Sequence, residues 1–97
     1  MLSLTEIRNT VVPLAQRYGL DKIYLFGSYA RGDAKETSDI DFRIDRGKMR
    51  GLQFGELYLD MQEAFARPVD ILTTKQLDEK FLLHIKDEEI LLYDARQ

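Results

Sequence analysis

The sequence predicts an α/β (α+β) fold in which helices flank a small mixed β-sheet. Three observations support this class: helical and strand-like patterns alternate along the chain, the strand-like segments are short, and 97 residues suffice for only one core. No repeat, low-complexity tract or linker divides the chain, so we expect a single domain over residues 1–97. The expected order of elements is α-β-α-β-α-β-α-β.

The first expected element is a helix over residues 4–18, where apolar residues recur at helical spacing. Ser3 and Glu6 form a capping-box pattern at its start, and Gly19 is a typical residue at a helix end. Pro13 lies inside this segment, so we expect either a kink or two short helices there.

Two strands are predicted next. Residues 23–26 are apolar, aromatic and β-branched, which is typical of a buried strand. Residues 39–45 alternate strictly between polar and apolar side chains, which indicates a strand with one buried face. A short helix is expected between them, beginning at Ser28.

The second half of the chain predicts helix, strand, helix and strand in turn. Apolar residues at helical spacing from Leu52 to Phe65 indicate an amphipathic helix. Residues 69–72 then form a strand, the segment around residues 77–85 a helix, and residues 90–93 a terminal strand.

Composition excludes several classes of protein. Acidic residues outnumber basic ones by 17 to 14, whereas a protein that binds a nucleic-acid backbone needs a basic surface. Zero cysteines exclude a disulfide scaffold and thiolate metal sites, and a single histidine excludes multi-histidine zinc sites. No apolar run approaches the ~18 residues of a membrane span, and the N-terminus lacks the apolar core of a signal peptide. We therefore expect a cytoplasmic domain that binds neither nucleic acid nor membrane.

Asp39 and Asp41 are the first chemistry-bearing feature. They stand on one face of the strand at 39–45, with Cα atoms ~6.5 to 7 Å apart, and two such anions repel each other unless cations neutralise them. Mg²⁺ prefers one or two carboxylates together with phosphate oxygens and water, and two ions form a clamp for displacement at phosphorus. The pair therefore predicts a site for one or two Mg²⁺ ions.

Gly27 and Ser28 are the second feature, at the end of the strand at 23–26. A strand, a glycine and a helix start form a phosphate site, because free backbone N–H groups face outward. The Ser28 hydroxyl can donate to a phosphate oxygen. No Gly-Lys-Ser/Thr follows, so this is not a Walker A loop. A phosphate site beside a dicarboxylate suits nucleotidyl or phosphoryl transfer.

Gly27-Ser28, a gap of ten residues and Asp39-x-Asp41 resemble the signature of the DNA polymerase β-type nucleotidyltransferase superfamily. The fuller string from Leu25 to Asp41 is similar to its minimal nucleotidyltransferase branch, which contains stand-alone domains of about this size. The resemblance implies a nucleotidyltransferase fold, like the palm of polymerase β, over essentially the whole chain. It also implies that Gly27 and Ser28 hold the β and γ phosphates.

The resemblance further implies a third carboxylate, on a later neighbouring strand, that positions or deprotonates the attacking hydroxyl. Asp70 occupies the matching place, so we expect it to act with Asp39 and Asp41 in catalysis and metal binding. One departure is visible: many relatives carry arginine at the position of Tyr29.

In its function, the branch often acts as the antitoxin of a pair whose toxin is a helical ribonuclease of the HEPN type. Active members transfer AMP from ATP to a tyrosine of that partner, so the resemblance implies a protein adenylyltransferase with ATP as substrate. Two alternatives remain open: an antitoxin that only caps its toxin, and a small-molecule nucleotidyltransferase of the antibiotic-modifying kind.

Other polar residues support only general expectations. Four basic residues crowd around the end of the strand at 39–45, and they form either a solvated loop or contacts with the triphosphate tail or an acidic partner: Arg43, Arg46, Lys48 and Arg50. We expect His84 to pack within a helix and the acidic run at 87–89 to form a solvated edge.

Overall fold

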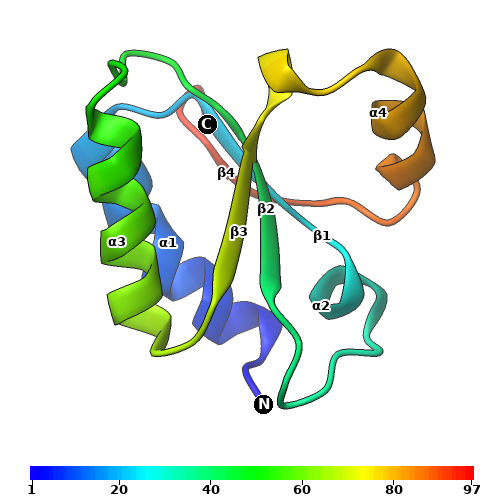
Figure 1. Cartoon of the computed structure of the whole chain (residues 1–97). Coiled ribbons are helices and arrows are strands. Elements are labelled where there is room, and N and C mark those ends of the chain that lie inside the picture. Colours follow the sequence, from blue (N-terminus) through cyan, green and yellow to red (C-terminus); the bar gives the residue numbers. More distant parts are fainter.

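The computed structural model describes residues 1–97 and shows a four-stranded sheet flanked by helices (Figure 1). The elements in chain order are α1 (Leu4–Tyr18), β1 (Lys22–Phe26), α2 (Ser28–Arg31), β2 (Ile40–Asp45), α3 (Gln53–Phe65), β3 (Val69–Thr73), the 3₁₀ turn η1 (Thr74–Gln76), α4 (Glu79–Ile85) and β4 (Ile90–Asp94). The predicted fold class and order of helices and strands are confirmed, with η1 as the one addition.

The sheet is mixed, with the strand order β3-β2-β1-β4. β1 runs antiparallel to both β2 and β4, whereas β2 and β3 are parallel and are connected through α3. Asp41 on β2 pairs in register with Phe26 on β1 and with Asp70 on β3. The end of β1 and the starts of β2 and β3 therefore meet at one edge of the sheet.

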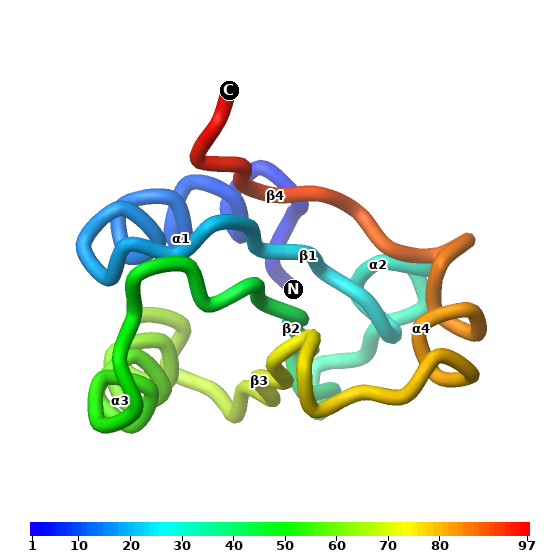
Figure 2. Tube along the Cα trace, turned by 90° about the horizontal axis from the view of Figure 1, so that it is seen from above, coloured from blue at the N-terminus to red at the C-terminus, as the bar shows by residue number.

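Helices cover both faces of the sheet, with α1 and α3 on one side and α2 and α4 on the other (Figures 1 and 2). The apolar residues of β2, namely Ile40, Phe42 and Ile44, are fully buried in the main core, as their alternation predicts. Phe42 stacks on Phe65 of α3 with ring centroids 5.9 Å apart. The polar residues of β2 consequently face α2 and α4.

Helix α1 is continuous through Pro13, so the alternative of two short helices is wrong. Proline removes one hydrogen-bond donor, but the buried face of the helix and both of its caps hold the remaining turns. Ser3 and Glu6 form the predicted reciprocal capping box, and Gly19 ends the helix in the left-handed conformation at φ 69°. None of the helices is both long and apolar enough to cross a membrane.

Candidate active site

The three predicted carboxylates gather at the edge of the sheet where β2 and β3 begin. Asp41 and Asp70 are each the second residue of their strand and lie directly opposite one another, and Asp39 precedes β2 by one residue. Side chains of register partners point to the same face of a sheet. Asp39 and Asp70 are exposed and Asp41 is half-buried, so this edge is open to ligands.

Electrostatic repulsion is concentrated on Asp41. Burial, followed by the negative charges of Asp70 and Asp39, raises the pKa of Asp41 from 3.8 to about 6, and the nearby Arg31 guanidinium offsets only part of this rise. Asp41 has no ion-pair partner in the chain. An incoming cation would relieve this repulsion, so the charge distribution favours cation binding.

This repulsion should make the stability of the ligand-free protein depend on pH. Between pH 3.8 and about 6 the folded chain holds a proton on Asp41 that the unfolded chain releases. The free energy of unfolding should therefore fall as the pH rises through this window. A pKa difference of this size lowers the free energy of unfolding by ~3 kcal/mol when the group is fully shielded from solvent. Because Asp41 is half exposed to solvent, we expect a decrease of about 1 kcal/mol.

Urea unfolding of the wild type and of Asp41→Asn, at pH 4 and pH 7, measures this effect. Between pH 4 and pH 7, the free energy of unfolding of the wild type should fall by about 1 kcal/mol more than that of the variant. The same pH dependence in both proteins would contradict the assignment of the repulsion to Asp41.

The donor set at this edge suits a hard divalent cation. All three side chains offer carboxylate oxygens, the ligands that Mg²⁺ prefers. No three histidine, cysteine, aspartate or glutamate side chains converge closely enough to form a cage that holds an ion by themselves. Mg²⁺ seldom uses such a cage, since it usually combines one or two carboxylates with water and substrate phosphates. The residues therefore fit an ion that binds together with a triphosphate.

Gly27 connects the carboxylates to the turn after β1. Its backbone has φ 77° and ψ −155°, a combination that is essentially restricted to glycine. A Cβ atom at this position would collide with Asp41 Oδ2 and lie 3.0 Å from Asp41 Cγ. The turn and the carboxylate are thus in direct contact, as the pairing of a phosphate site with a metal site requires.

The Ser28 hydroxyl and the Gly27 N–H differ in whether they already have a hydrogen-bond partner within the chain. The Ser28 hydroxyl makes no hydrogen bond within the chain. The Gly27 N–H, by contrast, donates to Glu88 Oε2 at 2.6 Å. Because α2 is only one turn long, backbone N–H groups and the hydroxyl, rather than a helix dipole, make up the phosphate-binding capacity of the turn.

Two residues of the acidic run at 87–89 are not part of a solvated edge, so that prediction is wrong for them. The side chains of Glu88 and Glu89 are only 18% and 10% exposed, and both form ion pairs. Glu88 pairs with Arg31 near Gly27, and Glu89 pairs with Arg43. Nothing in the local sequence indicates these ion pairs, because the partners are 57 and 46 residues away. His84, expected to pack within its helix, is exposed, and Ile85 is the buried residue of α4.

Arg43 is not available to a triphosphate. Its buried guanidinium lies 4.0 Å from the centroid of the Tyr24 ring and donates to both oxygens of Glu89 at 2.6 and 2.9 Å. It also donates to the Thr74 hydroxyl at 2.8 Å. The side chain thus ties β2 to η1 and to the loop before β4.

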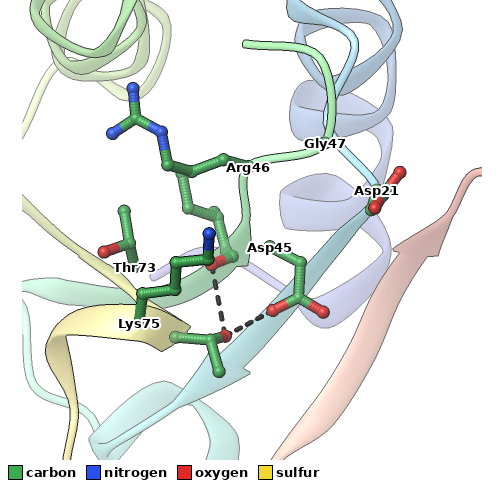
Figure 3. A pocket seen from close by; sticks show the side chains of 8 residues that line it. Asp21, Asp45, Arg46, Gly47, Thr73 and Lys75 are labelled. Carbon is green, nitrogen blue, oxygen red and sulfur yellow. Dashed lines mark hydrogen bonds between the residues drawn. The ribbon is translucent and has the colours of Figure 1, made fainter. Parts of the chain in front are cut away.

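The other three basic residues follow the C-terminal end of β2, whereas Asp41 lies near its start. Arg46 lines a polar pocket of about 420 Å³, together with Asp45, Thr73 and Lys75 (Figure 3). Asp45 is four residues along β2 from Asp41, a separation of ~13 Å in a strand. Lys48 and Arg50 come later in the chain than Arg46. The placement of Arg46 therefore does not support contact with the triphosphate tail, and the predicted alternatives stay open for Lys48 and Arg50.

Tyr29 has a structural role in this chain. Its ring packs against the main core, and its hydroxyl accepts a hydrogen bond from Arg67 Nη1 at 2.6 Å. Arg67 precedes β3 by two residues. The contact therefore joins α2 to the loop that leads to Asp70.

The mixed sheet, with acidic residues on adjacent strands against a glycine turn, is the arrangement that the resemblance to nucleotidyltransferases predicts. Residues 9–97 match the family described as "Polymerase beta, Nucleotidyltransferase", and the chain belongs to this family. The resemblance carried by the segment from Gly27 to Asp41 is thereby confirmed.

Similarity to individual proteins extends over most of the chain. The protein adenylyltransferase MntA of Thermococcus cleftensis is 35% identical over 82 residues, which cover 79% of this chain and 83% of that protein. A solved structure assigned as a minimal nucleotidyltransferase has a TM-score of 0.78 at 28% identity, covering 92% of this chain and 95% of its own. A chain from the complex of a tri-AMPylated Shewanella oneidensis HEPN toxin with an MNT antitoxin shares the fold, with a TM-score of 0.71 at 21% identity, covering 97% of this chain and 75% of its own. The chain is thus an enzyme of nucleotidyl transfer, similar to protein adenylyltransferases.

Proposed function

We propose that the protein transfers AMP from ATP to a hydroxyl group of a partner protein. The observation that carries this proposal is the juxtaposition of Asp41 with Asp70 and with the Gly27 turn at one open edge of the sheet. In this proposal Asp39, Asp41 and Asp70 hold two Mg²⁺ ions, and the Gly27-Ser28 turn binds the β and γ phosphates. The name of the Thermococcus cleftensis relative supports the same activity.

The transfer exchanges one phosphorus–oxygen bond for another. The acceptor oxygen bonds to the α-phosphorus, the bond from that phosphorus to the β-phosphate oxygen breaks, and pyrophosphate leaves. Asp70, exposed beside Asp41, accepts the hydroxyl proton. Bound Mg²⁺ would supply the positive charge that stabilises the transition state and the leaving pyrophosphate. The turn and the carboxylates orient the triphosphate for in-line attack.

We further propose that the acceptor belongs to a HEPN-type toxin, for which this protein is the antitoxin. The complex of an MNT antitoxin with a tri-AMPylated HEPN toxin supports this pairing, because its chain shares the fold. The exposure of Asp39 and Asp70 is consistent with it, since a side chain carried by a second protein can reach this edge.

The test is a transfer assay with a HEPN-type toxin as the acceptor. With Mg²⁺ and ATP labelled at the α-phosphate, we expect label on the partner and a mass increase of one or more AMP groups. ATP labelled at the γ-phosphate should leave no label, and EDTA should abolish transfer. A stable complex without label would favour an antitoxin that only caps its toxin, and label on an added antibiotic would favour the small-molecule alternative.

A further inference from the structure

We propose that the Glu88 carboxylate occupies the place of a nucleotide phosphate in the Gly27-Ser28 turn, and that the nucleotide must displace it in order to bind. This inference rests on the proposed function, because it takes the turn as the phosphate site. It adds a residue that sets the affinity of that site.

The contacts of Glu88 are those that a phosphate would make. Its Oε2 accepts the Gly27 N–H at 2.6 Å, and Arg31 Nη1 lies 3.2 Å from Oε2 and 3.4 Å from Oε1. A backbone N–H and a guanidinium are common donors to phosphate oxygens, and bonds from both to an anion are charge-assisted. The Glu88 side chain is only 18% exposed, whereas that of Arg31 is 47% exposed.

The Glu88 carboxylate adds to the negative charge around Asp41 when no cation is bound. Its charge repels Asp41, which already experiences the charges of Asp70 and Asp39. The bond to Gly27 therefore forms despite repulsion from the acidic edge. A triphosphate that arrives with Mg²⁺ brings its own neutralising charge, so exchange of the carboxylate for a phosphate relieves this repulsion.

The loop that carries Glu88 is fixed by the next residue. Glu89 makes two hydrogen bonds to the buried Arg43, at 2.6 and 2.9 Å. Arg31 also keeps a second acidic partner, Asp33, at 3.2 Å. Glu88 can consequently leave the turn by rotation of its own side chain, while the loop and Arg31 stay in place.

Removal of the competing charge should strengthen nucleotide binding. In Glu88→Gln we expect the Kd for Mg-ATP and for inorganic tripolyphosphate to fall about tenfold, which is the size expected when one charge-assisted contact no longer competes. AMP lacks the β and γ phosphates, so its Kd should not change. Titration calorimetry with the full chain measures all three ligands.

Asp87→Asn is the matched control, because Asp87 is an exposed neighbour of Glu88 and has no ion pair. It removes the same charge from the same loop and should leave all three Kd values within about twofold of the wild type. An equal gain in both variants would reduce the effect to net charge and overturn the inference. Thermal unfolding of Glu88→Gln, with a midpoint near that of the wild type, verifies that the variant is folded.

The remaining outcomes separate the inference from the proposed function. If the wild type binds Mg-ATP and Glu88→Gln binds it equally or more weakly, Glu88 supports the turn instead of competing for it, and only this inference fails. If neither protein binds Mg-ATP or tripolyphosphate, the turn is not a phosphate site, and both proposals fail.

Discussion

Asp41→Asn is expected to slow AMP transfer about a thousandfold while the fold remains intact, because Asp41 is one of the carboxylates proposed to bind metal, and its loss should remove several kcal/mol of transition-state stabilisation. Asp41 lies at the centre of the acidic edge, between Gly27, which directly follows β1, and Asp70 on β3. An amide of the same size preserves the packing and removes the charge. The rate of label transfer to the partner, at saturating Mg-ATP, is the measurement.

The same substitution should stabilise the ligand-free protein at pH 7, by about 1 kcal/mol, since it ends the repulsion from Asp70 and Asp39. Misfolding would lower activity and stability together. Lower activity combined with higher stability therefore distinguishes loss of the carboxylate from misfolding.

Asp45→Asn is the control for this experiment. Asp45 stands on the same strand and the same face as Asp41, but at the opposite end, where it accepts a hydrogen bond from Thr74. Its replacement should change the transfer rate by less than about threefold, given the ~13 Å along the strand to Asp41. Full activity of Asp41→Asn, or an equal loss in Asp45→Asn, would remove Asp41 from the proposed site.

Gly27→Ala is expected to destabilise the protein by about 2 to 6 kcal/mol and to abolish binding of Mg-ATP. The backbone conformation at Gly27, with φ 77° and ψ −155°, costs an alanine about 1 to 3 kcal/mol by itself. The added Cβ must also displace the Asp41 carboxylate, whose Cγ would be 3.0 Å away, and such overpacking typically costs a further 1 to 3 kcal/mol. Urea unfolding and titration calorimetry measure the two effects.

Gly32→Ala separates strain from collision. Gly32 also has a positive φ of 87°, but a Cβ atom there would meet nothing within 4 Å. It should therefore cost only about 1 to 2 kcal/mol, the penalty of the left-handed conformation. If the two substitutions cost the same, contact with Asp41 contributes nothing. Addition of Asp41→Ala to Gly27→Ala should recover part of the lost stability, because the two residues are in contact and their effects are not additive.

Most of the fold could be predicted from the sequence, because hydrophobic periodicity is a local signal. Strict alternation places Ile40, Phe42 and Ile44 in the core, and the same alternation places Asp41 on the opposite face. That Asp41 and Asp70 lie opposite one another could be anticipated only through the resemblance to nucleotidyltransferases, since neither strand segment alone specifies the register of pairing.

The acidic partners of Arg31 and Arg43 could not be predicted from hydrophobic periodicity. Glu88 and Glu89 are adjacent charged residues near the end of the chain, and a charged pair in a loop is usually solvated. Their ion pairs with Arg31 and Arg43 depend on the antiparallel pairing of β4 with β1, which brings the loop before β4 to the end of β1. Tertiary pairing of this kind leaves no periodic pattern in the sequence.

The crossover through α3 has a consequence for how the enzyme gains its activity during refolding. Asp39 and Asp41 come from one segment, but Asp70 joins them only when β3 docks in parallel on β2. Pairing of strands distant in sequence is slow compared with helix formation. Recovery of turnover after dilution from denaturant should accordingly lag behind the far-ultraviolet circular dichroism signal, so that catalysis itself reports the docking of β3 on β2.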